Sequence, residues 1–194
     1  ADRLGIYVDP TFSNPENYGG FVHIISTIFF SFQIYADFAG YSLIAIGIGR
    51  ALGFNFGINF KRPYFATSFQ DFWRRWHISL SKWLKDYLYI PLGGSRGNDS
   101  NKIRNVIIIF LVSGFWHGAN WTFIAWGAIN AIYFLPLLIL KKNRIHTNSI
   151  SLNKIFPNLH ELYQILRTFL LVVIAWVFFR SDSIFKALEF IQLM

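Results

Sequence analysis

The sequence predicts an all-α, polytopic membrane protein. Hydrophobic residues make up 54% of the 194-residue chain and charged residues only 14%, which is too little charge to cover an ordinary soluble surface. Aromatic residues reach 20%, a content typical of chains whose rings lie at the headgroup boundary. Residues 105–140 carry no formal charge, and an uncharged run of this length is typical of membrane-embedded chain.

The N-terminal third reads as a loop followed by two apolar stretches. Residues 1–20 contain Pro, Asp and a Gly-Gly pair, so we expect a loop there. Residues 21–36 are apolar but carry scattered Ser, Thr and Gln, which in a membrane span usually face protein. Asp37 separates this stretch from the Gly-rich residues 38–49. We interpret Asp37 as a structural hydrogen-bond partner of nearby hydroxyl groups, with a proton relay as the alternative.

Residues 61–104 form a basic region, with nine Lys or Arg against three Asp. The positive-inside rule places this region on the cytoplasmic side. Within it, apolar residues recur every three or four positions over residues 68–90, which predicts one amphipathic helix at the membrane interface that ends at Pro91. Its wheel places the aromatic residues inward and the basic ones toward solvent: Trp73, Trp76 and Trp83 inward, and Arg74, Arg75, Lys82 and Lys85 outward.

The uncharged residues 105–140 are too long for one span. As a single helix they would extend about 54 Å, against a hydrocarbon core of about 30 Å. Gly114, Gly118 and Asn120 provide the natural breaking point, so we expect a broken or re-entrant arrangement around His117. We expect a polar loop over residues 141–160, a final span over residues 162–179, and the start of another element at residues 184–194.

His117 is the strongest candidate for catalysis. A titratable ring in an uncharged stretch is costly when protonated, so we expect it to be neutral, sheltered by Trp116 and Trp121. A neutral imidazole is suited to act as a general base. His77 falls on the rim of the predicted aromatic face, where either a catalytic or an ordinary packing role is open. We predict that His77 and His117 line one continuous cavity, because each polar ring on an aromatic face needs a hydrogen-bond partner. The remaining histidines, His23, His146 and His160, are weak candidates.

Other chemistries lack support. The chain has no cysteine, and it contains no GxSxG, HExxH or P-loop pattern and no clustered acidic pair. We therefore predict no metal site. The net charge of +8 comes largely from basic residues between apolar stretches, so we do not expect nucleic-acid binding.

Three segments in order carry a family resemblance: YADFAGYSLIAIG, NFKRPYFATSFQDFWRRWHISLSKWLKDYLYIPLGGSRG and SGFWHGANWTFIAWG. They resemble the membrane-bound O-acyltransferase (MBOAT) family, and within it the bacterial alginate-type polysaccharide O-acetyltransferases. The resemblance implies that His117 is the essential histidine and His77 the second characteristic position. It also suggests substrate-binding roles for Trp116, Asn120, Trp73, Trp76 and Asp37. Leu43 stands where relatives usually carry an acidic residue, which weakens any carboxylate pair near Asp37.

The resemblance further implies a multi-pass enzyme of the bacterial inner membrane, bound to the lipid bilayer. It would move an acetyl group from a cytoplasmic thioester, such as acetyl-CoA, to hydroxyls of an extracytoplasmic polysaccharide such as alginate. We expect no bound cofactor. We do expect a periplasmic partner protein of the SGNH-hydrolase kind. We expect residues 1–194 to be the central to C-terminal part of a single MBOAT membrane domain, within a longer chain.

Three alternatives stay open on the sequence alone. D-alanyl transfer to teichoic acid is the nearest competitor within the enzyme class. A proton-coupled transporter would also place His and Asp in broken membrane helices. A non-catalytic scaffold for a periplasmic enzyme would keep the aromatic faces but would tolerate loss of His117.

Overall fold

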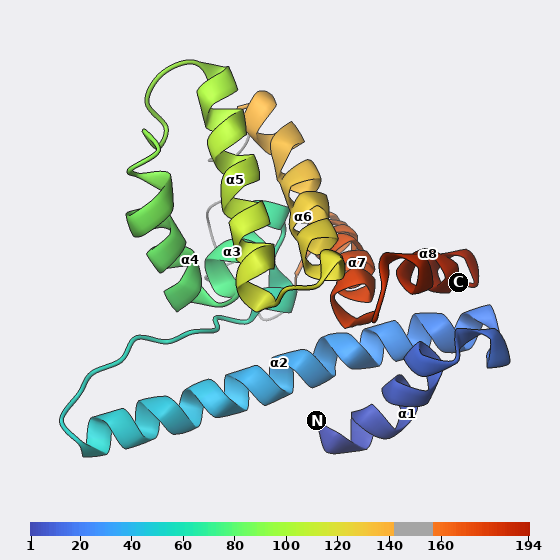
Figure 1. The fold of residues 1–194 in the computed structure, drawn as a ribbon. Helices are drawn as coiled ribbons and strands as arrows, with labels where there is room; N and C mark the ends of the chain where they lie inside the picture. The colour runs from blue at the N-terminus through green and yellow to red at the C-terminus, as the bar shows by residue number, and fades with distance from the viewer. Residues whose placement is uncertain (142–156) are drawn as a thin grey trace.

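The computed structural model describes residues 1–141 and 157–194, and these form helices joined by short connections (Figure 1). In this described part of the chain there is no strand, which agrees with the predicted all-α class. The helices follow one another as α1 (Asp2–Ser13), η1 (Pro15–Asn17), α2 (Gly20–Ala51), η2 (Pro63–Phe65), α3 (Phe69–Arg75), α4 (Ile78–Leu84), η3 (Lys85–Tyr89), α5 (Asp99–His117), α6 (Trp121–Ile139), α7 (Leu159–Arg180) and α8 (Ile184–Gln192).

The N-terminal expectations were wrong in two respects. Residues 1–20, expected to be a loop, contain helices α1 and η1. Pro10 lies inside α1, and Val8, buried completely, anchors that helix in the core. The two apolar stretches form one continuous 32-residue helix, α2, and Asp37 lies within it without interrupting it.

The predicted break near His117 is confirmed. Helix α5 ends at His117 and α6 begins at Trp121, so the two helices form a hairpin whose turn is residues 118–120. Asn120 caps α6, because its Oδ1 accepts a hydrogen bond from the backbone N–H of Thr122. The helices pack closely, since a Cβ at Gly114 would collide with the carbonyl oxygen of Phe123.

The single amphipathic helix expected over residues 68–90 was wrong. Helix α3 ends at Arg75, and α4 begins at Ile78 after His77, which takes a left-handed backbone conformation with φ of 47°. Beyond Leu84 the chain continues as the π-helical turn η3. No Gly or Pro marks either the break at His77 or the start of η3, so the apolar spacing predicted one continuous helix.

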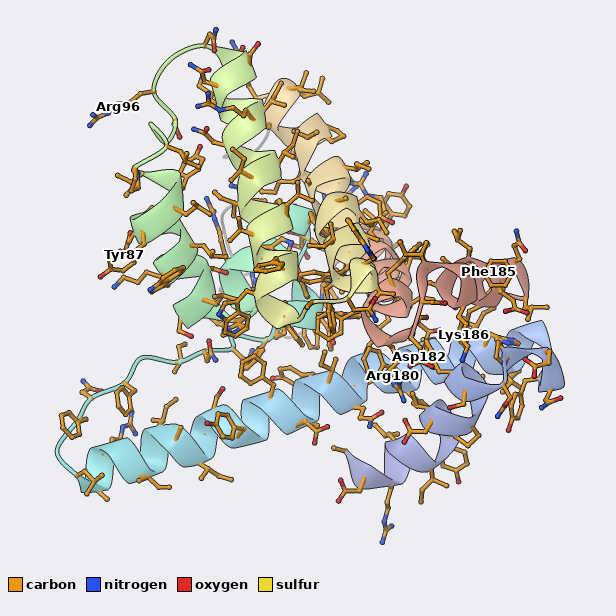
Figure 2. All side chains as sticks on the ribbon, viewed as in Figure 1. Tyr87, Arg96, Arg180, Asp182, Phe185 and Lys186 are labelled. Carbon is orange, nitrogen blue, oxygen red and sulfur yellow. The ribbon has the colours of Figure 1, made fainter. Side chains whose placement is uncertain are left out.

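Within residues 1–141 and 157–194, three helices are long and apolar enough to cross a membrane: α2, α6 and α7. Their aromatic side chains meet in one core, where Trp126 of α6 stacks on Trp176 of α7 with ring centroids 5.9 Å apart. The expected span at residues 162–179 corresponds to α7, which begins in a capping box at Asn158. Near the α7–α8 turn, Arg180 donates to Asp9 of α1 at 2.7 Å (Figure 2).

Candidate functional site

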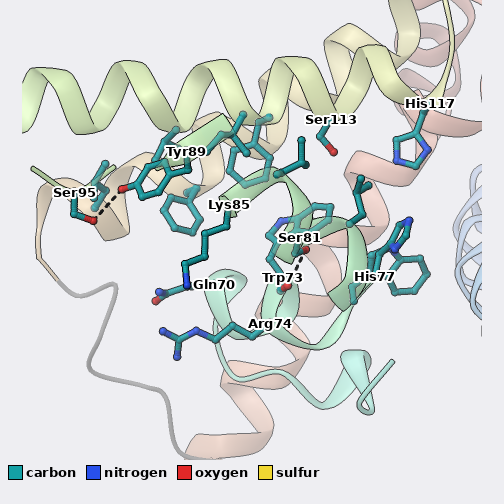
Figure 3. Close-up of a pocket in the computed structure, with 18 residues that line it drawn as sticks. Gln70, Trp73, Arg74, His77, Ser81, Lys85, Tyr89, Ser95, Ser113 and His117 are labelled. Atoms are coloured by element: carbon teal, nitrogen blue, oxygen red, sulfur yellow. Dashed lines mark hydrogen bonds between the residues drawn. The ribbon is translucent and has the colours of Figure 1, made fainter. Parts of the chain in front are cut away.

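A cavity of about 600 Å³ runs between α5 and the segment formed by α3, α4 and η3 (Figure 3). His77 and His117 lie at one end, while Tyr89 and Ser95 lie at the other. The structure therefore places both candidate histidines in one cavity, as the sequence suggested. The lining residues are Gln70, Trp73, Arg74, Trp76, His77, Leu80, Ser81, Leu84, Lys85, Tyr89, Ser95, Val106, Ile109, Phe110, Ser113, His117, Phe134 and Leu138.

His117 is the last residue of α5 and sits in an aromatic cage. Its ring packs edge-on against Trp116, Trp126 and Phe179, with centroids 5.0, 5.2 and 5.0 Å away. Trp126 and Phe179 come from α6 and α7, so three helices enclose the imidazole. Trp121, expected to shelter His117, is 75% exposed. The expectation failed for Trp121 because α6 starts there and turns that side chain away from the core.

His77 occupies the junction between α3 and α4, not a helix face. It is 7% exposed, and its ring packs edge-on against Phe38 of α2 at 4.6 Å and near Trp116 of α5 at 5.8 Å. Burial, together with the repulsion from a positive charge on the neighbouring His117, lowers the pKa of His77 to about 4. The ring is therefore neutral at physiological pH. A left-handed conformation at a non-Gly residue is uncommon and is often found at functional sites.

Arg74 and Lys85 line the cavity between its two ends (Figure 3). Both residues are also exposed to solvent, as the helical wheel predicted. Arg75, also placed outward, is instead buried and pairs with Asp71 at 2.9 Å. Trp83, expected inward, is 52% exposed. Two cationic side chains therefore face the cavity and make its middle section suited to an anionic ligand.

The other predicted substrate-binding residues divide into two groups. Trp73 and Trp76 line the cavity, and Trp116 packs against both histidine rings without lining it. Asn120 lies outside, where its Nδ2 donates to the carbonyl oxygen of Asp182 in the α7–α8 turn. Asp37 also lies outside, exposed on α2.

The remaining histidines lie away from this cavity. His23 is fully buried, and its two ring nitrogens lie 3.0 Å from the carbonyl oxygens of Gly19 and Pro15, which fits a packing role. His160 is exposed on α7, and His146 lies outside the described residues. Among residues 1–141 and 157–194, no three His, Cys, Asp or Glu side chains are close enough to hold a metal ion.

Sequence reasoning did not single out Asn59, which contacts His77 directly. Its Oδ1 lies 3.2 Å from the Nδ1 of His77, across 18 residues of sequence. Asn59 opens the NFKRPY run within one of the three family-like segments, so its place in that segment was the available signal. Periodicity could not find it, because residues 53–62 between α2 and η2 belong to no helix.

The fold and the site together define a helical membrane protein in which two imidazoles and two cationic side chains line one cavity. The chain belongs to the membrane-bound O-acyltransferase family, whose profile matches residues 12–170. The family resemblance of the three sequence segments is thereby confirmed.

Relatives of this chain are named for several different acyl-transfer reactions. It is 46% identical to the probable alginate O-acetylase AlgI of Pseudomonas syringae pv. tomato, over 96% of this chain and 34% of that protein. It is 40% identical to the peptidoglycan O-acetyltransferase of Helicobacter pylori, over 99% of this chain and 35% of the relative. The teichoic acid D-alanyltransferase of Streptococcus thermophilus is 36% identical over 53% of this chain and 26% of its own length. The chain thus spans about a third of the length of the first two relatives.

Proposed function

We propose that the full-length protein transfers an acetyl group from a thioester donor to hydroxyl groups of an extracytoplasmic polysaccharide such as alginate. The observation that carries this proposal is the single cavity, which has Arg74 and Lys85 along its middle and His77 and His117 at one end. The cationic side chains suit an anionic donor such as acetyl-CoA, and the histidines suit proton transfer.

His117 acts in this proposal as the general base. The hydroxyl oxygen of the acceptor attacks the thioester carbonyl carbon, and its proton passes to the imidazole of His117. A C–O bond forms, the C–S bond breaks, and the leaving thiolate takes the proton, so that an ester and a thiol result. The rings of Trp116, Trp126 and Phe179 pack around the His117 ring and reduce the access of water to it, which limits competing hydrolysis of the thioester.

Two buried nitrogens of the cavity lining support substrate binding there. The Nε2 of His77 and the Nε1 of Trp73 are both buried, and neither has a hydrogen-bond partner among the described residues. One is suited to accept a hydrogen bond and the other to donate one. Buried polar atoms are rarely left unpaired, so a substrate that carries both donor and acceptor groups satisfies them when it enters.

The proposed orientation of the protein in the membrane follows from the position of its basic residues. The basic region at residues 61–104 lies on the cytoplasmic side in this proposal, so the donor enters from the cytoplasm and the acceptor meets it from the other face of the bacterial inner membrane. A periplasmic SGNH-type partner would complete delivery to the polymer. The identity to a teichoic acid D-alanyltransferase favours D-alanyl transfer to teichoic acid as the second candidate, with the same roles for the histidines.

The test is the acyl content of cell-envelope polysaccharide, measured by mass spectrometry in cells that express the full-length protein or its variants. We expect His117→Ala to abolish acylation while the protein still inserts and accumulates. His160→Ala, an exposed histidine on α7, serves as the matched control and should keep wild-type acylation. Wild-type acylation in His117→Ala would overturn the general-base role, and the mass of the added group separates acetyl from D-alanyl transfer.

A further inference from the structure

Asn59 links the segment after α2 to the break that carries His77. Its Oδ1 lies 3.2 Å from His77 Nδ1 and accepts hydrogen bonds from the backbone N–H and the hydroxyl of Ser79, at 3.2 and 3.0 Å. Its Nδ2 donates to Ser42 Oγ on α2 at 3.1 Å, and its backbone carbonyl accepts from the N–H of Ile78 at 3.0 Å. One side chain thus joins α2 to the start of α4.

These contacts assign the proton on His77. A backbone N–H can only donate, so the Asn59 atom that faces the N–H of Ser79 must be the amide oxygen, which excludes the flipped amide. The same oxygen faces His77 Nδ1 and can only accept. The hydroxyl of Ser79 also lies 3.4 Å from Nδ1, but it donates its proton to the same Asn59 oxygen at 3.0 Å and so can only accept from the ring. Nδ1 therefore carries the proton of the neutral ring, and Nε2 is left with a free lone pair.

The unprotonated Nε2 of His77 is placed to accept a hydrogen bond from a ligand in the cavity. His77 Nε2 is buried, has no hydrogen-bond partner among the described residues, and belongs to a ring that lines the cavity. The low pKa of His77 keeps that lone pair available at physiological pH. The titratable and charged groups that share the cavity with the ring are His117 of α5, Arg74 of α3, and Lys85 and Tyr89 of η3.

We infer that Asn59 is a positioning residue: it holds His77 in the Nδ1–H tautomer so that Nε2 accepts a hydrogen bond from an N–H or O–H group of the substrate. Asn59 also steadies the left-handed backbone of His77, because its carbonyl and its amide oxygen bind the two N–H groups that follow at Ile78 and Ser79. This inference rests on the proposed function only for the nature of the substrate. The tautomer itself is a property of the free protein.

The experiment has a spectroscopic arm and a kinetic arm. In the full-length protein labelled with ¹⁵N-histidine, the nitrogen shifts of His77 should show a protonated Nδ1 and a bare Nε2, assigned by their loss in His77→Gln. Asn59→Leu removes the acceptor, so the spectrum should show a mixture of tautomers. We expect kcat to fall about 10- to 100-fold, the range found when the hydrogen-bond partner of a metal-bound histidine is removed.

Asn59→Asp is the sharper variant, because it keeps the acceptor and adds a negative charge. That charge favours the protonated ring and raises the pKa of His77, so activity should be lost at a higher pH than in the wild type as the pH falls. Asn55→Asp adds the same charge at an exposed residue of the same segment and should leave the pH profile unchanged.

A wild-type spectrum with the proton on Nε2 would overturn the inference, even if Asn59→Leu fails to fold. An Asn59→Asp profile that matches the wild type and Asn55→Asp would also overturn it. If the tautomer is as assigned but the full-length protein transfers no acyl group, the proposed function fails and the positioning role of Asn59 stands.

Discussion

Ser113 offers the most direct test of the cavity as the path of the acyl donor. It is 4% exposed, lines the cavity, and lies between the basic side chains and His117 (Figure 3). His117 lies four positions further along the chain, a rise of about 6 Å along α5. Ser113→Trp would place a large ring across the cavity at this point, one helical turn before the proposed base.

The expected loss follows from that distance. A donor stopped at Ser113 leaves its thioester carbonyl about 6 Å short of His117, whereas reacting atoms must come within about 3 to 3.5 Å. A misplacement of about 1 Å already costs about 100-fold, so Ser113→Trp should lower the rate of transfer at least about 100-fold. Because the new ring enters open space, the protein should still fold.

The assay compares initial rates of polysaccharide acylation in cells at equal amounts of full-length protein. Val112→Trp adds the same ring one residue earlier on α5, where the side chain is 37% exposed, and should keep the wild-type rate. Ser113→Leu provides a smaller obstruction and should give an intermediate loss. Wild-type acylation in Ser113→Trp, or equal losses in the Ser113 and Val112 variants, would refute the cavity as the donor path.

Two further predictions concern coupling and packing. The double variant His77→Ala/His117→Ala should transfer scarcely more slowly than the worse single variant, because residues that act on one transition state are not additive; fully multiplicative losses would assign the rings to separate steps. Gly127→Ala should lower the melting temperature in detergent, because its Cβ would collide with the carbonyl oxygen of Phe110. In the control Gly40→Ala on α2, the new Cβ meets nothing within 4 Å, so the melting temperature should stay unchanged. Equal melting temperatures for the two variants would contradict the close α5–α6 packing.

The break at His117 could be predicted because its causes are local. An uncharged run too long for one span must bend, and Gly118 and Asn120 are the residues that allow a turn and a cap there. The break at His77 has a different cause. No Gly or Pro marks it, and the conformation is held by Asn59, which lies 18 residues earlier. Periodicity reports only on neighbours in sequence, so it carried a helix straight through this position.

The dependence of periodicity on neighbouring residues also explains why some predictions about the cavity were right and others were wrong. Both histidines were placed in one cavity from the need of each buried ring for polar partners, and this reasoning does not depend on the helix register. The directions of Arg75 and Trp83 did depend on the register and were wrong, because a wheel assumes an uninterrupted helix. The N-terminal helix was missed for a related reason. Pro10 and the nearby Gly pair read as loop residues, while the contact that stabilises α1 is burial of Val8 against distant chain.

The aromatic cage around His117 cannot be completed when the histidine itself is synthesised. It needs Phe179, and the turn beside it is tied to Asp182 through Asn120, a link across 62 residues of sequence. At about 5 to 20 residues per second, the ribosome takes about 3 to 12 s to make that stretch after the histidine itself. During this interval the imidazole lacks one wall. The site is therefore complete only after α7 has been synthesised, and a chain interrupted before α7 carries the histidine without its enclosure.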